Sequence, residues 1–404
     1  MSANTDILSS IRREAEARGV RLDDVVFPDE IVLAPGASAR LPAYLKEKGY
    51  RRALLVGDLL TMAAADGERL AAELQELGIA VASTLMTPNP AGDVVADEAS
   101  VVQTLLDMQR HEADVAVAVG AGTLHDITRY AAFTAGLPFV SLPTAPSVDG
   151  FTSRGAPLLI RGDKITVPAI GPSAIFADTD ILARAPGTMV AAGFGDMLGK
   201  YTSLFDWRVG QALGGEVYDP FVAELTARAL ADCVAHVDAI GLRTPEGIEL
   251  LTRALIESGL AMLIFGQSHS ASGAEHHLSH YWEMELLRTG RRQVLHGAKV
   301  GAACAVILEH YRQWAASRSE LAGNGRQEND AQPSGTLMAH LPDIRAWLDE
   351  LPTSDRIREL LRIAGGPQTP GELGIDEALV ARSLREADRI RPNRRTLLRF
   401  INEG

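Results

Sequence analysis

The chain has 404 residues, 46% of them hydrophobic, and a formal net charge of −13 at pH 7. This length is enough for two domains, each with its own core. The acidic balance excludes a general nucleic-acid binder and a binder of anionic membranes, because both need extended positive surface. No apolar run approaches a membrane span or the core of a signal peptide. Because Cys233 and Cys304 both lie in apolar helical contexts, we expect no disulfide framework and a cytoplasmic location.

Residues 1–180 are expected to form an α/β, Rossmann-like domain. Between about residue 50 and residue 180, short apolar runs alternate with helical stretches; the runs are RALLVGD, GIAVASTLM, ADVAVAVG, PFVSLPT and AIFAD. This alternation is typical of a parallel sheet with helices on both faces. Such sheets bind ligands at the carboxyl ends of their strands, so the loops there are candidate binding segments.

Two of these loops suggest a nucleotide. Asp58 ends the first run, where a carboxylate can accept hydrogen bonds from a ribose and favour NAD over NADP; it can also cap the following helix. Gly120 and Gly122 separate a strand from a helix, so backbone amides there can cradle a pyrophosphate. The six-residue dinucleotide fingerprint is absent, which leaves a purely structural glycine turn open. Asp126, in the first helical turn, can simply satisfy the helix dipole.

The loop PTAPSVDGFTS follows the fourth run. Thr144 and Ser147 there can hydrogen-bond a cofactor, and Asp149 can take a substrate hydroxyl. Local turn chemistry is the alternative for all three residues.

Residues 181–404 are expected to form a mostly α-helical domain. Segments with a helical repeat include PFVAELTARALADCVAHVDAI and GIELLTRALIESGLAMLIFG. The polar stretch from Ala322 to Gly335 is expected to be a mobile loop.

Five of the ten histidines lie between His269 and His296. His276 and His280 are four residues apart and share one helix face, whereas His277 points away from it. Asp196 lies upstream in a glycine-flanked turn, and His296 begins the segment HGAKVG. One carboxylate and two imidazoles suit zinc, nickel or iron and leave coordination positions open for a substrate. Isolated surface histidines are the alternative, but we expect Asp196, His276 and His296 to bind a metal.

Five motifs occur in order across residues 120–301: GAGTLHD, PTAPSVDGFTS, GFGDMLGKYTSLFDW, SGAEHHLSHYW and HGAKVG. Together they resemble the bacterial sn-glycerol-1-phosphate dehydrogenases, the AraM-like branch of the iron-alcohol-dehydrogenase and dehydroquinate-synthase superfamily. The resemblance covers nearly the whole chain. It implies a dehydroquinate-synthase-like fold, with an N-terminal domain that binds NAD(H), NADP(H) being less favoured, and a helical domain that holds one divalent metal.

The resemblance assigns roles to residues by motif position. The metal ligands are Asp196, His276 and His296. Lys200 stands where iron alcohol dehydrogenases carry a further histidine, which favours zinc or nickel over obligatory iron, with iron still compatible. This lysine either faces a substrate phosphate or forms a structural ion pair. The cofactor contacts are expected from Asp58, Gly120, Gly122, Thr123, Asp126, Thr144, Ser147 and Ser153.

The reaction that the resemblance implies is hydride transfer from NADH to dihydroxyacetone phosphate, which yields sn-glycerol 1-phosphate. Asp149 and His280 are expected to bind the substrate and take part in catalysis, with His280, or a water that it orients, as proton donor. Alternatives are a dehydrogenase of another polyol or of a phosphonate or other phosphorylated carbonyl compound, a dehydroquinate-synthase-like cyclase, and a non-enzymatic scaffold. By family analogy we expect a homodimer. The loop residues Arg129 and Arg154 leave the identity of the phosphate-binding groups open.

Overall fold

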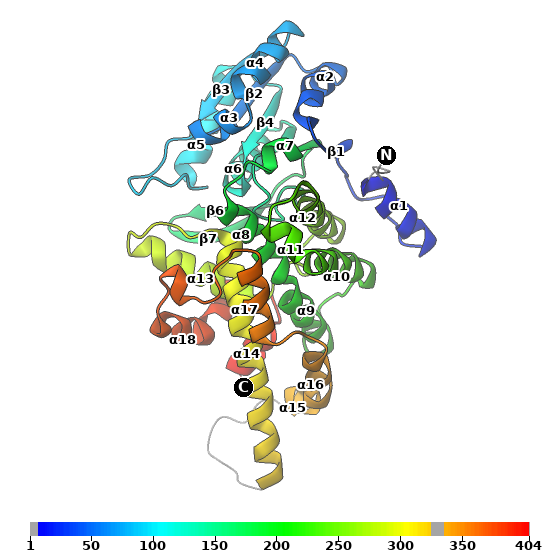
Figure 1. Ribbon diagram of the computed structural model, residues 1–404, viewed down its shortest axis with the longest axis vertical. Helices are drawn as coiled ribbons and strands as arrows, with labels where there is room; N and C mark the ends of the chain where they lie inside the picture. The colour runs from blue at the N-terminus through cyan, green and yellow to red at the C-terminus, as the bar shows by residue number, and fades with distance from the viewer. Residues whose placement is uncertain (1–6, 325–334, 404) are drawn as a thin grey trace.

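The computed structural model describes residues 7–324 and 335–403 (Figure 1). Its N-terminal half contains a six-stranded sheet in which every strand pair is parallel, with the spatial order β1-β8-β5-β4-β2-β3. The strands are β1 (Glu30–Ala34), β2 (Arg52–Gly57), β3 (Ala80–Leu85), β4 (Val115–Gly120), β5 (Phe139–Pro143) and β8 (Ala174–Asp178). The five strands expected from the apolar runs are confirmed. The edge strand β1 was missed.

Helices cover both faces of the sheet because the strand residues alternate between two cores. Leu55 and Val117 pack with helices α2 (Arg40–Glu47) and α4 (Gly67–Glu76) on one face. Leu54 and Ala116, their chain neighbours, pack with α5 (Glu98–Arg110) and α6 (Gly122–Ala135) on the other. Continuous apolar strands are therefore buried on both sides, as expected of a parallel sheet.

The order of the strands reverses between β2 and β4. From β2 the chain moves outward to β3, and it then returns to the opposite side of β2 to form β4 and continue to β5. In doubly wound sheets the crevice at such a reversal is where ligands bind. Asp58 follows β2 and Ala121 follows β4, so both flank this crevice.

A two-stranded antiparallel hairpin, β6 (Gly155–Ile160) and β7 (Asp163–Pro168), leaves the sheet after β5. It lies between the two halves of the molecule (Figure 1). Lys164 of β7 donates to Glu283 of helix α13 (Ala274–Arg288) at 2.6 Å, which ties the hairpin to the helical half. The sequence did not indicate this hairpin.

After Asp178 the described residues contain helices and no further strand, which confirms a mostly α-helical C-terminal part. These helices are α7 (Thr179–Leu182), α8 (Gly187–Leu198), α9 (Lys200–Gly214), α10 (Pro220–Ala235), α11 (Val237–Gly241), α12 (Pro245–Phe265), α13 (Ala274–Arg288), α14 (His296–Asn324), α15 (Gly335–Ala339), α16 (Leu341–Asp349), α17 (Ser354–Ile363), α18 (Glu377–Glu386) and α19 (Leu397–Glu403), with the 3₁₀ turn η3 (Ala387–Ile390) before α19.

Some boundaries differ from those expected. The helix predicted through residue 240 divides at His236 into α10 and α11. The predicted loop from Ala322 to Gly335 is helical at both ends, because α14 continues to Asn324 and α15 begins at Gly335; residues 325–334 lie outside the described part. The N-terminal helix α1 (Ile7–Ala17) shares its core with α10, where Ile11 and Phe221 belong to one buried cluster. A division between domains near residue 180 stays a prediction.

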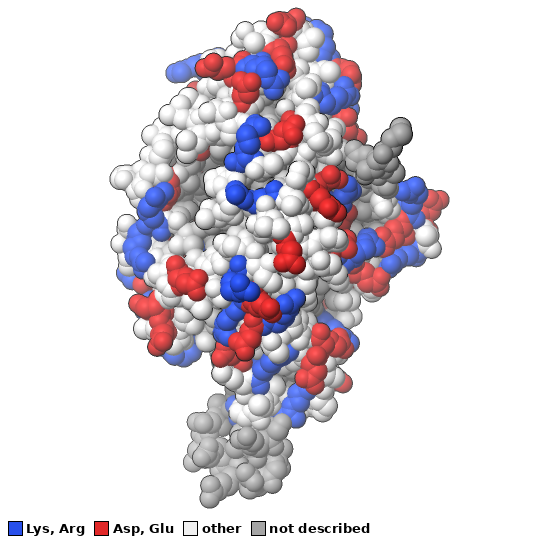
Figure 2. All heavy atoms as spheres, viewed as in Figure 1, with Lys and Arg blue, Asp and Glu red and all other residues white. Residues whose placement is uncertain are grey.

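Basic and acidic side chains intermingle over the face of the molecule shown in Figure 2. No extended positive surface appears on this face. Among the described helices, none is long and apolar enough to cross a membrane.

Candidate functional site

A large cleft, with a volume of about 1340 Å³, runs from the carboxyl ends of the sheet strands into the helical half. It brings together residues that are far apart in the sequence. The expected site residues on its wall are Asp58, Gly122, Thr123, Asp126, Thr144, Ser147, Asp149, Ser153, His276, His280 and His296. Gly120, Asp196 and Lys200 are not on the wall; Asp196 and Lys200 are fully buried behind it.

Close packing of α8 against α14 places two of the expected metal ligands side by side. A Cβ atom on Gly297 would lie 1.8 Å from the Ala192 carbonyl oxygen, and one on Gly195 would lie 2.4 Å from the Gly297 carbonyl oxygen. Only glycine allows the two helices to approach so closely. Asp196 follows Gly195 and His296 precedes Gly297, so this packing sets their separation.

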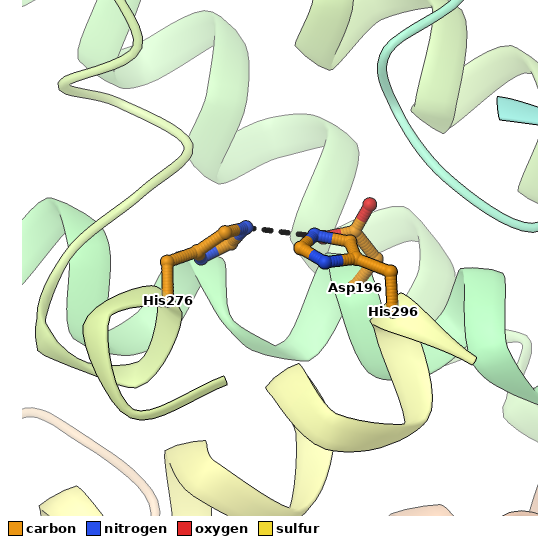
Figure 3. Close-up of side chains that lie close together, drawn as sticks. All are labelled: Asp196, His276 and His296. Carbon is orange, nitrogen blue, oxygen red and sulfur yellow. Dashed lines mark ion pairs between the residues drawn. The ribbon is translucent and has the colours of Figure 1, made fainter. Parts of the chain in front are cut away.

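Asp196, His276 and His296 form a compact triad whose ligand atoms all lie within 4.8 Å of one another. The His276 Nε2 atom is 3.6 Å from Asp196 Oδ1, and His296 Nε2 is 4.0 Å from the same oxygen. Figure 3 shows both imidazole rings pointing toward the carboxylate. Asp196 is fully buried, whereas the His296 side chain is 26% exposed. Three ligands with one side facing a cleft are typical of a catalytic rather than a structural metal site.

Glu275 fixes the orientation of His276, a role that the sequence did not suggest. Its Oε1 atom accepts hydrogen bonds from His276 Nδ1 and from the Gly273 amide, both at 2.7 Å, and its Oε2 atom accepts one from Thr202 at 2.6 Å. Burial disfavours the charged carboxyl, but these hydrogen bonds hold the pKa of Glu275 below its usual range. The ionised carboxylate keeps the proton of His276 on Nδ1 and leaves Nε2 free to bind a metal.

Lys200 joins two buried carboxylates. Its Nζ atom lies 2.7 Å from Asp149 Oδ2 and 3.3 Å from Asp196 Oδ1. Burial alone would lower the pKa of this lysine, but the two carboxylates raise it, so the ammonium stays charged. The ion pair that was one of its two expected roles is therefore present. Asp149 also accepts from Ser258 at 2.8 Å, and its backbone amide donates to Asp196 Oδ2 at 3.0 Å.

His280 lies one helical turn beyond His276 on the same face of α13. Its ring centroid is 6.2 Å from that of His276 and 5.7 Å from that of His296. Burial lowers the pKa of His280 well below its usual value, and the positive charge of Arg391 lowers it further. His277 is completely buried and does not line the cleft, as its different helix face predicts.

The part of the cleft next to the sheet is shaped by backbone geometry. Asp58 caps helix α3 (Leu59–Ala64): its carboxylate accepts from the Thr61 amide at 2.8 Å, and Thr61 Oγ1 accepts from the Asp58 amide at 3.0 Å. A Cβ atom on Gly122 would lie 2.7 Å from a methyl group of Val148, so glycine there lets the loop after β5 approach the start of α6. The amino end of α6 faces the cleft, where an anion is favoured.

Asp126 and Arg129 form a partly buried ion pair on α6, with 2.9 Å between Oδ1 and Nη1. Arg129 also donates to the carbonyl oxygens of Gly155 and Phe151, so it anchors the loop that carries Asp149. Burial raises the pKa of Asp126 to about 7, although Arg129 opposes the shift. Arg129 is absent from the cleft wall, whereas the exposed Arg154 lies on it.

The cleft wall also holds basic residues that the sequence reasoning missed: Lys164, Lys299, Arg391 and Arg394. Glu283 accepts from Lys164 at 2.6 Å and from Lys299 at 2.9 Å. The basic run IRPNRR near the C-terminus was the available signal for the two arginines, but basic runs usually mark solvated surface.

Residues 32–186 match the family model of iron-containing alcohol dehydrogenases. Two solved structures share the fold: a probable glycerol dehydrogenase from Sinorhizobium meliloti 1021 and glycerol dehydrogenase from Schizosaccharomyces pombe. The first is 18% identical with a TM-score of 0.67 and covers 94% of this chain and 96% of its own. The second is 20% identical with a TM-score of 0.65 and covers 94% of this chain and 87% of its own. The fold is therefore that of the iron-containing alcohol dehydrogenase class, here with three side chains grouped so that they could hold a metal ion.

Comparison with curated sequences narrows this class. A glycerol-1-phosphate dehydrogenase from Geobacillus stearothermophilus, named as NAD(P)-linked, is 50% identical and covers 93% of this chain and 92% of its own length. Enzymes of the same name from Bacillus subtilis and Aeropyrum pernix are 44% and 31% identical, over 98% and 92% of this chain. The chain belongs to the glycerol-1-phosphate dehydrogenase family. The resemblance expected from the five motifs is confirmed.

Proposed function

We propose that this enzyme reduces dihydroxyacetone phosphate to sn-glycerol 1-phosphate with NADH and one divalent metal. The observation that carries the proposal is the triad of Asp196, His276 and His296 beside a cleft that also reaches the glycine turn at the amino end of α6. The names of the full-length relatives support the substrate.

The side chains present fit a metal ion. Two imidazole nitrogens and one carboxylate oxygen converge, and the Glu275 hydrogen bond leaves His276 Nε2 as a lone-pair donor. This donor set suits zinc or nickel, and it also accepts iron. When bound there, a divalent cation supplies Lewis acidity toward a carbonyl oxygen of the substrate.

The residues around the triad organise the rest of the reaction. The Lys200 ammonium balances the charges of Asp149 and Asp196, which lowers the cost of burying two carboxylates. Asp149 lies on the cleft wall, where its remaining lone pairs accept a hydrogen bond from a substrate hydroxyl. His280 lies next to the triad and on the cleft wall, so it can pass a proton to the product oxygen, directly or through a water that it orients, while its other ring nitrogen takes up a proton from solvent.

The nucleotide is held along the opposite part of the cleft. Gly120, Gly122 and Thr123 at the amino end of α6 surround the pyrophosphate, with Asp126 beside them. Thr144 and Ser147 lie on the nicotinamide side, and Ser153 follows in the same loop. The Asp58 carboxylate faces the adenosine ribose and repels a 2′-phosphate, which favours NADH over NADPH. We also propose a cytoplasmic homodimer; the two buried free cysteines suit a reducing compartment.

The test is NADH oxidation at 340 nm by metal-reconstituted protein, with dihydroxyacetone phosphate compared with unphosphorylated dihydroxyacetone. We expect turnover with the phosphate. Preference for the neutral ketone would move the assignment to a polyol dehydrogenase. No turnover with either ketone would indicate another phosphorylated or phosphonate carbonyl substrate, or a cyclase. A cyclase of the dehydroquinate-synthase type returns its NAD oxidised, so net consumption of NADH excludes it.

The role of His280 has a separate test. The His280→Ala enzyme should bind metal and NADH as the wild type does but lose about 10²- to 10⁴-fold in kcat, as expected for loss of a general acid. Full turnover with normal metal content would remove His280 from the mechanism.

A further inference from the structure

Arg394 is a buried cation whose hydrogen-bonding capacity is unused. The residue is 5% exposed, and within the described residues none of its three guanidinium nitrogens has a hydrogen-bond partner. The nearest carboxylate is that of Glu216, whose Oε1 atom is 3.9 Å from Arg394 Nε and accepts instead from the Arg395 amide at 2.7 Å. Buried guanidinium groups are normally satisfied, because an unpaired one costs several kcal/mol of desolvation. Arg394 lies on the wall of the cleft, so a ligand there can supply the acceptors.

Arg391 lies on the same wall and is held in place by hydroxyl groups. Its Nη1 atom donates to Ser272 Oγ at 2.9 Å and to Ser268 Oγ at 3.2 Å, and its Nη2 atom donates to Thr166 Oγ1 at 3.2 Å. These contacts orient the guanidinium without neutralising it. Burial lowers the pKa of Arg391 and of Arg394, and the charge of Arg394 lowers the pKa of Arg391 further. Two like charges held close together in a water-poor wall create a strong local attraction for an anion.

The lysines around the cleft are already paired with carboxylates. Lys164 and Lys299 both donate to Glu283, and Lys200 is held between Asp149 and Asp196. Arg154 and Arg184 also line the cleft, but both are exposed. Among the described lining residues, Arg394, which is buried, and Arg391, which is half-buried, are thus the shielded cations without a close carboxylate partner.

The two arginines lie near the triad. Ser272, which accepts from Arg391, is four residues before His276, and the charge of Arg391 is felt at His280. A phosphate ester of a three-carbon ketone is short, so its phosphate must bind close to the group that holds its carbonyl oxygen. The position of Arg391 meets this requirement.

We propose that Arg394 and Arg391 form the subsite for the phosphate group of the substrate. Arg394 makes the main charge-assisted contact with the anion, and Arg391 binds it from the opposite side. The proposal rests on the proposed function for the identity of the ester. The subsite itself takes any small phosphate or phosphonate. Guanidinium forks match the oxygens of such an anion in two-point geometry, which gives the site specificity as well as affinity.

The test compares Arg394→Ala, Arg391→Ala and Arg394→Lys with Arg389→Ala as the matched control, because Arg389 is exposed in the same segment and does not line the cleft. Calorimetry measures the Kd of inorganic phosphate for the metal-loaded protein, and steady-state kinetics measure KM and kcat for dihydroxyacetone phosphate and for dihydroxyacetone. Tm and metal content check the fold of each variant.

We expect Arg394→Ala to raise the Kd of phosphate and the KM for the phosphorylated ketone by roughly 10- to 100-fold, the loss typical of a hydrogen bond to a charged group. The KM for dihydroxyacetone should stay near the wild-type value, and Arg389→Ala should behave as wild type. Arg394→Lys keeps the charge but loses the fork, so its Kd should lie between those of the wild type and Arg394→Ala. If Arg394→Ala does not fold, the phosphate Kd values of Arg394→Lys and Arg391→Ala test the proposal instead.

Unchanged phosphate binding in the folded variants would overturn the proposal, and so would an equal loss for the phosphorylated and neutral ketones, which marks a structural role. The proposed function can fail separately. If the wild type consumes no NADH with dihydroxyacetone phosphate but binds inorganic phosphate through Arg394, the subsite stands and the assigned substrate is wrong.

Discussion

Replacing Glu275 with glutamine tests whether the metal site depends on the group behind it. Glu275 is fully buried and accepts from His276 Nδ1 at 2.7 Å, which holds the imidazole with Nε2 toward Asp196. Glutamine has the same size and can still accept through its carbonyl, but it has no charge and its amide can turn toward His276. Loss of such an outer partner typically weakens metal binding about 10- to 100-fold, or roughly 1.4–2.8 kcal/mol.

The assay is zinc competition with a chromophoric chelator, run on the wild type, Glu275→Gln and Glu285→Gln. Glu285 lies on the same helix, but it pairs with Arg288 and Arg382 at the surface, so its replacement should leave zinc affinity unchanged. The Tm of the metal-free proteins separates loss of metal affinity from loss of fold. Zinc affinity within about twofold of wild type in a folded Glu275→Gln protein would refute the argument that Glu275 orients His276.

Three further changes probe the structure. Lys200→Met leaves Asp149 and Asp196 buried without their cation, so the metal-free protein should lose about 3–5 kcal/mol of stability in urea unfolding. Lys48→Met, at the exposed Asp29 pair, should cost far less, and equal losses would contradict a stabilising buried ion pair. Asp58→Ala should reduce the preference for NADH over NADPH in kcat/KM and cost about 1 kcal/mol through loss of the α3 cap, whereas an unchanged cofactor ratio would place the ribose elsewhere. Burial disfavours the charged form of Glu283, but Lys164 and Lys299 outweigh burial and hold the pKa of Glu283 well below the usual 4.5. The stability that the Glu283 carboxylate contributes is therefore present above pH 4.5 and is lost as the pH falls below that value. In Glu283→Gln the Tm should fall less steeply with acid than in the wild type, and parallel curves would argue against this linkage.

The sequence revealed the sheet because its strands are continuous apolar runs with clear turn signals between them. The sequence did not predict the β6–β7 hairpin because the strand Asp163–Pro168 is half exposed and partly polar. In addition, the two strands pair antiparallel and lie outside the parallel pattern. The edge strand β1 was missed because it begins with a charged residue and only Leu33 in it is buried.

The grouping of Asp196, His276 and His296 was predictable because the two histidines lie in compact motifs and the family resemblance placed all three residues together. Glu275 gave no signal, since nothing local distinguishes a carboxylate that supports a ligand from a solvated one. Arg391 and Arg394 lie far along the chain from the triad, and only tertiary packing brings them to the cleft. The two possible roles of Lys200 could not be separated until the positions of Asp149 and Asp196 were known.

The most direct measurement of the central claim is the product formed from dihydroxyacetone phosphate and NADH by the zinc- or nickel-loaded protein, analysed by a chiral assay. We expect one glycerol phosphate per NADH consumed, all of it sn-glycerol 1-phosphate, with no turnover after chelation or in the Asp196→Ala variant. Formation of sn-glycerol 3-phosphate, or equal turnover without metal, would contradict the account.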